Sequence, residues 1–141
     1  MPRTTTESGA DSTPPPPRKS SDSQTVALTA VRVAAENRGQ DILVLDMRKR
    51  TDLFDYFVII TGRSGRQIKA ISDEIDHTLT EKLGDHCLRT EGYKDSRWIV
   101  LDYGDVLIHI FDEAMRDFYR LEELWADAKR LDISGIVEKA K

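Results

Sequence analysis

The chain has 141 residues, the usual length of one domain, which excludes a multidomain assembly. No apolar run approaches the roughly 20 residues that a membrane-spanning helix needs, and no charged segment followed by an apolar one opens the chain as in a signal peptide. A single cysteine, Cys87, excludes an internal disulfide. These features predict a cytoplasmic protein without a membrane partner.

The charge balance argues against one class of function. Lys and Arg number 21 and Asp and Glu 25, giving a net charge of −4. A protein that grips nucleic acid through a broad basic field has the opposite balance, so sequence-specific nucleic-acid binding is not expected. A mildly acidic domain suits a basic partner, although solubility alone favours the same net charge.

The composition divides the chain into three parts. All five prolines precede residue 18, and the stretch 1–23 is rich in Ser and Thr, which predicts a disordered tail. Residues 24–130 carry the apolar patterns of a folded domain. The pattern weakens after Leu131, so 131–141 is predicted to be a C-terminal tail.

Helical spacing of apolar residues predicts a first helix over 25–38, followed by two apolar, β-branched strands at 41–47 and 55–61 in the middle of a sheet. A second helix follows Ser64, which forms a capping box with Gln67, and it stops at Gly84. With a short strand near 87–91, the second strand and this helix make a βαβ unit.

Two strands at 97–102 and 105–111 flank Tyr103 and Gly104 and predict a hairpin in which Asp102 faces Asp105 and Trp98 faces His109. One face is core, and the other is mixed. A last helix over 113–129 is predicted to bury Met115, Phe118, Leu121, Leu124, Trp125 and Ala128 and to leave Arg116, Asp117, Arg120 and Glu123 in solvent. The fold class is α/β, a single domain with a mixed sheet of about five strands flanked by helices.

Three places offer candidate chemistry. The turn 62–65, with Arg63 and Arg66 before a helix, offers an anion site or an ordinary capped turn, but it lacks the motif of a phosphate-binding loop. The opposed carboxylates of Asp102 and Asp105 suggest a basic partner or a metal, or simply an exposed turn. No set of oxygen or imidazole ligands completes a metal site.

The third place is the mixed hairpin face. His109 opposite Trp98 resembles a general base, yet no nucleophile or orienting group accompanies it. A large aromatic side chain among acids and aliphatics is typical of a protein-binding hot spot, and the alternative is that one of the protein's own helices covers this face.

Four segments together resemble the iojap family, the bacterial ribosomal silencing factors. They are DYFVIITGRSGRQIKAISDEI at 55–75, Glu91 with Gly92, WIVLDYGDVLIHIF at 98–111 and RDFYRLEELW at 116–125. The resemblance runs from about residue 25 to 128.

This resemblance implies a fold similar to a reduced nucleotidyltransferase domain. It also implies a binding protein, not an enzyme and without a cofactor, that docks on ribosomal protein L-fourteen of the large ribosomal subunit. Docking there sterically prevents the small subunit from joining and represses translation when nutrients are limiting. The predicted docking residues are Trp98, Asp102, Tyr103, Asp105, His109 and Phe111, with Arg116 and Tyr119 at the edge.

Two alternatives remain at this stage. One is a nucleotidyltransferase-like enzyme that uses the turn 62–65 with Asp102 or Asp105. The other is a dimeric adaptor, because the resemblance also suggests a homodimer.

Overall fold

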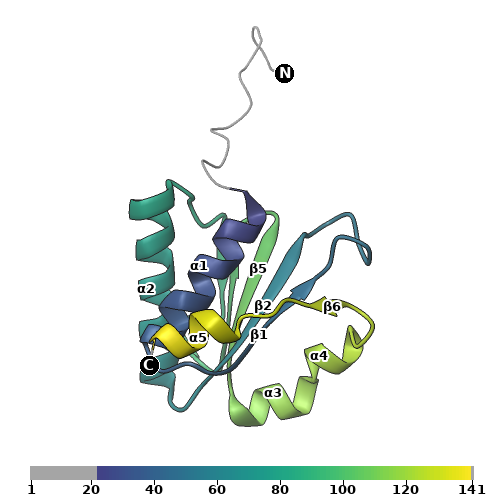
Figure 1. Cartoon of the computed structure of the whole chain (residues 1–141). Coiled ribbons are helices and arrows are strands. Elements are labelled where there is room, and N and C mark those ends of the chain that lie inside the picture. Colours follow the sequence, from purple (N-terminus) through teal and green to yellow (C-terminus); the bar gives the residue numbers. More distant parts are fainter. Residues whose placement is uncertain (1–21, 141) are drawn as a thin grey trace, which may run out of the picture.

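A computed structural model describes residues 22–140 and shows a six-stranded mixed sheet with helices on both faces (Figure 1). The sheet order is β3-β4-β5-β2-β1-β6. The strands are β1 (Gln40–Asp46), β2 (Tyr56–Gly62), β3 (Arg89–Glu91), β4 (Trp98–Asp102), β5 (Val106–Asp112) and β6 (Lys129–Arg130). The helices are α1 (Ser23–Glu36), α2 (Gly65–Leu83), α3 (Glu113–Tyr119), α4 (Leu121–Leu124) and α5 (Ser134–Ala140).

The central pair of strands organises two apolar layers. β2 is buried along its whole length and runs parallel to β5, so the carboxyl ends of both strands meet at one end of the sheet. Helices α1, α2 and α5 cover one face, where Val58, Ile60 and Ile108 contribute to the larger core. Side chains of α3 and α4 pack on the other face around Phe57 and Phe111.

The α/β fold class is confirmed, with six strands where about five were expected. Helix α2 begins and ends as predicted. The Ser64 hydroxyl accepts from the Gln67 amide at 3.1 Å, and Gly84 is left-handed at the end of the helix. Gln67 differs from a capping box, since its side chain accepts from the Arg63 amide instead. In the described part of the chain, no helix is long and apolar enough to cross a membrane.

The hairpin forms, but the predicted register is wrong. Trp98 pairs with Phe111, and Asp102 pairs with Leu107. The two-residue loop is Gly104 and Asp105, because Gly104 supplies the positive φ of 89° that such a turn requires. Tyr103 therefore pairs with Val106, and its side chain lies in the core.

The predicted last helix is interrupted. Arg120 adopts a left-handed conformation with φ 48°, which separates α3 from α4, and the chain then enters β6. The predicted C-terminal tail instead contains α5, whose Ile136 and Val137 pack against the larger core. The tail predicted at 1–23 lies outside the described residues except for Asp22, the N-cap of α1, and Ser23, its first residue.

Arg116 was predicted to lie in solvent, and it is buried instead. Its guanidinium donates to Thr61 Oγ1 at 2.7 Å and to the carbonyl of Asp41, and it forms a 3.0 Å ion pair with Glu122. One side chain of α3 therefore connects β1, β2 and α4. This connection holds α4 against α3 despite the left-handed residue between them.

We predict that Arg116→Met lowers the free energy of unfolding by about 3 kcal/mol, because it leaves partly buried polar partners unsatisfied. Urea denaturation measures this change. Arg32→Met is the matched control, since Arg32 pairs with Glu36 on the surface of α1 and is 46% exposed. The control should change stability by less than about 1 kcal/mol. Equal losses of unfolding free energy in the two variants would show that the buried contacts of Arg116 stabilise the fold no more than a surface ion pair does.

Candidate functional site

The structure divides the predicted docking residues between the two ends of β5. Asp102, Tyr103 and Asp105 lie at its beginning, whereas Phe111 lies at its end, where α3 starts. A strand of this length spans about 20 Å, so these residues cannot form one compact site. His109 lies between the two groups.

The residues at the turn have structural roles. The side chain of Asp102 accepts from the Gly104 amide at 2.8 Å and shapes the turn. The hydroxyl of Tyr103 donates to Asp76 of α2 at 2.8 Å, and the ring is fully buried, so Tyr103 is not a surface anchor. The carbonyl of Asp105 accepts from the amides of residues 55 and 56. The predicted opposition of Asp102 and Asp105 is therefore wrong.

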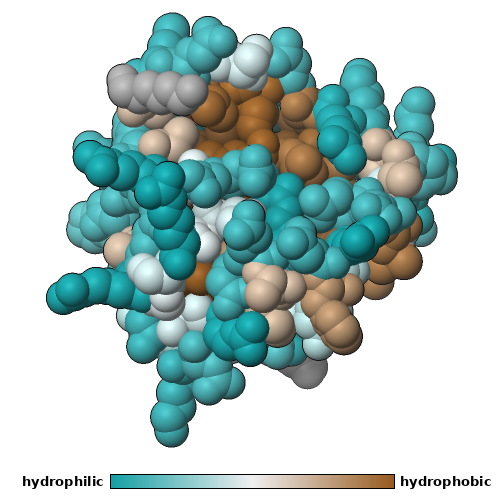
Figure 2. Space-filling view, turned by 90° about the horizontal axis from the view of Figure 1, so that it is seen from below, coloured by the Kyte–Doolittle hydropathy of each residue, from teal (hydrophilic) through white to brown (hydrophobic). Residues whose placement is uncertain are grey.

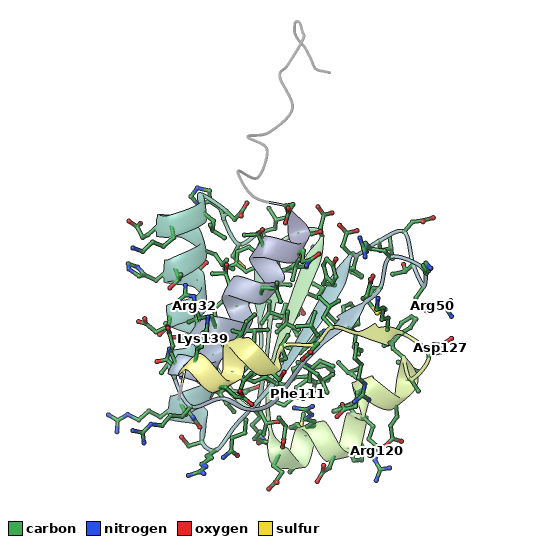
Figure 3. The ribbon with its side chains drawn as sticks, viewed as in Figure 1. Arg32, Arg50, Phe111, Arg120, Asp127 and Lys139 are labelled. Atoms are coloured by element: carbon green, nitrogen blue, oxygen red, sulfur yellow. The ribbon has the colours of Figure 1, made fainter. Side chains whose placement is uncertain are left out.

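At the other end of β5, aromatic side chains form a continuous series from the core to the surface. Trp98 stacks on buried Phe111 and contacts Tyr119, with both pairs of ring centroids 4.7 Å apart. Tyr119 in turn contacts Phe118, with ring centroids at 5.0 Å. Figure 3 shows Phe111 near α3, with Arg120 farther along the same part of the chain. Trp98 and Tyr119, both predicted docking residues, are therefore in contact, and their role in docking stays a prediction.

The exposed end of this series is an apolar surface. Phe118 is 78%, Tyr119 46% and Leu124 69% exposed, and we call these three residues the α3–α4 surface. Figure 2 views the molecule from the end at which α3 lies in Figure 1, and apolar atoms there form patches between hydrophilic side chains. The sequence analysis assigned Phe118 and Leu124 to a buried helix face. That assignment is wrong, because Arg116 takes the buried face of α3 and the chain breaks at Arg120, where no glycine or proline indicates a helix end.

A hollow borders this region. It has a volume of about 470 Å³ and is lined by residues of β1, β2, α3 and α4: Asp41, Ile42, Leu43, Thr61, Glu113, Arg116, Asp117 and Glu122. Four of the lining residues carry carboxylates, and the one cation among them, Arg116, is already paired. Glu122 Oε1 is buried without a hydrogen-bond partner among the described residues. The hollow is therefore suited to a positively charged group.

His109 is buried against the aromatic series and does not reach the surface. Its Nδ1 accepts from the Trp98 indole N–H at 3.2 Å, so the proton of the neutral ring lies on Nε2, which has no hydrogen-bond partner within the described part. Burial lowers the pKa of His109 to about 4. The neutral, enclosed imidazole therefore stabilises the orientation of Trp98 through this hydrogen bond.

The turn 62–65 is explained by local structure. Ser64 caps α2, and Gly62 and Gly65 lie where added side chains would meet Ile68 and Ser96. Among residues 22–140, no group of three or more His, Cys, Asp or Glu side chains is arranged to hold a metal ion.

We predict that His109 makes stability depend on pH between about 6.5 and 4. Below pH 6.5 the imidazole of residue 109 binds a proton in the unfolded chain but stays neutral in the folded one until about pH 4. The free energy of unfolding therefore falls by about 3 kcal/mol as the pH is lowered from 6.5 to 4. Unfolding free energies of the wild type and His109→Leu across this range give the difference. The variant should lose this part of the pH dependence, while His77→Gln and His86→Gln, on the surface, should retain it. A parallel dependence in the wild type and His109→Leu would contradict the prediction.

Comparisons with known proteins agree with this architecture. The family model "Ribosomal silencing factor during starvation" matches residues 20–141. A ribosomal silencing factor of Bacillus subtilis is 38% identical over 104 residues, covering 74% of this chain and 87% of that protein. The chloroplastic protein Iojap of Zea mays is 34% identical over 107 residues, covering 76% of this chain but 46% of that longer protein.

A solved structure has the same fold. A crystal structure of a protein from Chromobacterium violaceum superposes with a TM-score of 0.72 at 34% identity, covering 75% of this chain and 88% of that one. The family match includes the segment of α5, which the sequence analysis treated as a tail outside the domain. Given this match and relatives more than 30% identical, the chain belongs to the ribosomal silencing factor family.

Proposed function

We propose that this protein binds the large ribosomal subunit through ribosomal protein L-fourteen and blocks the joining of the small subunit. The observation that carries the proposal is the exposed α3–α4 surface in a member of the ribosomal silencing factor family. The protein acts by occupying the face at which the subunits meet, so inhibition needs no turnover and scales with occupancy.

Apolar contact supplies the affinity in this proposal. Phe118 and Leu124 expose most of their side chains, and the Phe118 ring contacts Tyr119, which contacts Trp98 on the sheet. Large side chains that are exposed in the free protein and held by a rigid scaffold are typical of hot spots, because their burial releases water at little cost in side-chain entropy.

The negative charge around the α3–α4 surface favours a basic partner in this proposal. The segment 112–127 contains six acidic and two basic residues, and one of the two basic residues is the buried Arg116. A Lys or Arg side chain of the ribosomal protein would fit the acidic hollow beside Glu122. This pairing directs the α3–α4 surface toward a basic protein.

Co-sedimentation with separated subunits tests the function. The protein should pellet with large subunits and not with small ones, and large subunits preloaded with it should form fewer joined ribosomes when small subunits are added. Pelleting with neither subunit, or binding without any loss of joining, would contradict the proposal.

We predict that Phe118→Ala and Leu124→Ala each weaken binding to large subunits by about 2 kcal/mol, or about thirtyfold in Kd, while the fold is retained. Titration of labelled protein with purified large subunits measures the change. Leu88→Ala is the matched control, since Leu88 is 70% exposed near the opposite, turn end of β5. Equal losses for Leu124→Ala and Leu88→Ala would contradict the assigned surface. A change in self-association without a change in ribosome binding would assign it to a homodimer instead.

A further inference from the structure

Three exposed arginines lie at the end of the sheet that also carries α3. Arg38 follows α1, and Arg63 and Arg66 belong to the turn and first residues of α2. We call Arg38, Arg63 and Arg66 the arginine surface.

Hydrogen bonds hold these segments together. The Gln67 side-chain amide donates to the carbonyl oxygens of residues 37 and 38 at 3.2 and 3.0 Å. The oxygen of the same amide accepts from the Arg63 backbone N–H at 2.6 Å. One side chain thus fixes the two arginine-bearing turns relative to each other, so their positions do not depend on a bound partner.

The charges of these arginines are available for a partner. Seven other arginines of the described chain form ion pairs: Arg32, Arg48, Arg50, Arg89, Arg97, Arg116 and Arg120. Arg38, Arg63 and Arg66, like Arg130 of β6, form none with any described residue, and the Arg63 guanidinium donates to the uncharged side-chain oxygen of Gln40 at 2.8 Å. In an acidic protein, three such cations gathered at one place are not explained by internal pairing.

The arginine surface is continuous with the start of α3. Gly62, which precedes Arg63, pairs with Asp112, the N-cap of α3. Ser96 packs so closely on Gly65 that an added Cβ would lie 2.6 Å from its hydroxyl, and the neighbouring Arg97 forms a 3.0 Å ion pair with Asp112. This end of the sheet therefore presents arginines after β2 and acidic and apolar residues after β5.

From this arrangement we infer that the arginine surface contacts the phosphate backbone of ribosomal RNA beside the docked ribosomal protein. The inference rests on the proposed function, which places this end of the molecule on the large subunit. Guanidinium groups bind phosphate oxygens with paired, charged hydrogen bonds, and phosphate contacts carry no base sequence. RNA next to the protein partner would thus place phosphate groups against the arginine surface, while the acidic residues of α3 and α4 contact the basic protein.

The test compares two triple variants of equal charge. Arg38→Gln, Arg63→Gln and Arg66→Gln together remove the arginine surface. The control combines Lys49→Gln, Lys129→Gln and Arg130→Gln, which are exposed near the beginning of β2, about 20 Å away along that strand, in the region marked by Arg50 and Asp127 in Figure 3. Both variants remove three positive charges and leave the hydrogen bonds of Gln67 to the backbone in place. A loss of binding that is due only to long-range electrostatic attraction would therefore be equal in the two variants, whereas a loss of local phosphate contacts would appear only in the arginine variant.

Binding to purified large subunits is measured at several salt concentrations. The arginine variant should bind at least about tenfold more weakly, and its salt dependence should fall by about 2 to 3 in the slope of log K against log salt, since each phosphate contact contributes about 0.9. The control variant should behave like the wild type within about threefold, because it keeps the three arginines that make the proposed phosphate contacts.

Hydroxyl-radical footprinting of the ribosomal RNA identifies the partner. The wild type should protect a stretch of backbone that the arginine variant, added at saturating concentration, leaves open. Unchanged affinity and salt slope in the arginine variant, or weaker binding with the same RNA footprint as the wild type, would overturn the inference and leave the proposed function standing. Failure of the wild type to bind large subunits at all would contradict the proposed function and this inference with it.

Discussion

The buried guanidinium of Arg116 is the constraint on which the functional end of this molecule depends. A charge removed from water must be compensated, and here Thr61, the Asp41 carbonyl and Glu122 provide the compensation from three directions. The Glu122 contact crosses the left-handed residue Arg120 and holds the short helix α4 in place. Within α3, Arg116 takes the buried face, so Phe118, two residues further on, points to the surface, and Leu124 at the end of α4 is exposed as well.

The topology brings two different surfaces to the same end. β2 and β5 are parallel neighbours, so the segments that follow them start side by side. The turn after β2 carries arginines, and the helix after β5 carries acidic and apolar side chains. Ligands of open α/β sheets characteristically bind beyond the carboxyl ends of the strands. We propose that here the same position contacts a basic protein and RNA, the two components of a ribosomal surface.

The sequence predicts what short-range patterns determine. The apolar run of β2 and the caps of α2 at Ser64 and Gly84 depend on neighbouring residues, and both are confirmed. The hairpin is also predicted, but its register is not, since glycine can occupy either position of the loop and the choice depends on burying Tyr103 against α2. The break at Arg120 could not be predicted, because contacts of Arg116 with residues distant in the sequence stabilise it.

The same distinction applies to the candidate site. Of the docking residues predicted from the resemblance, Trp98 and Tyr119 are in contact in the structure. Asp102 and Tyr103 belong to the same family block of the hairpin as Trp98, yet strand β4 carries them to the opposite end of the sheet. Phe118 and Leu124 were predicted to be buried because their spacing fits the apolar face of one continuous amphipathic helix. Arg63 and Arg66 were noted as part of a capped turn, and their association with Arg38 depends on Gln67, whose long-range contacts no local pattern reveals.

The most direct measurement is site-specific photocrosslinking from the α3–α4 surface. A photoreactive phenylalanine analogue placed at Phe118, or at Leu88 as the control, is irradiated in the presence of large ribosomal subunits, and the crosslinked partner is identified by mass spectrometry. The account predicts a crosslink from position 118 to ribosomal protein L-fourteen and none from position 88. A crosslink to L-fourteen from position 88 alone, or from position 118 only to a different ribosomal protein, would contradict it.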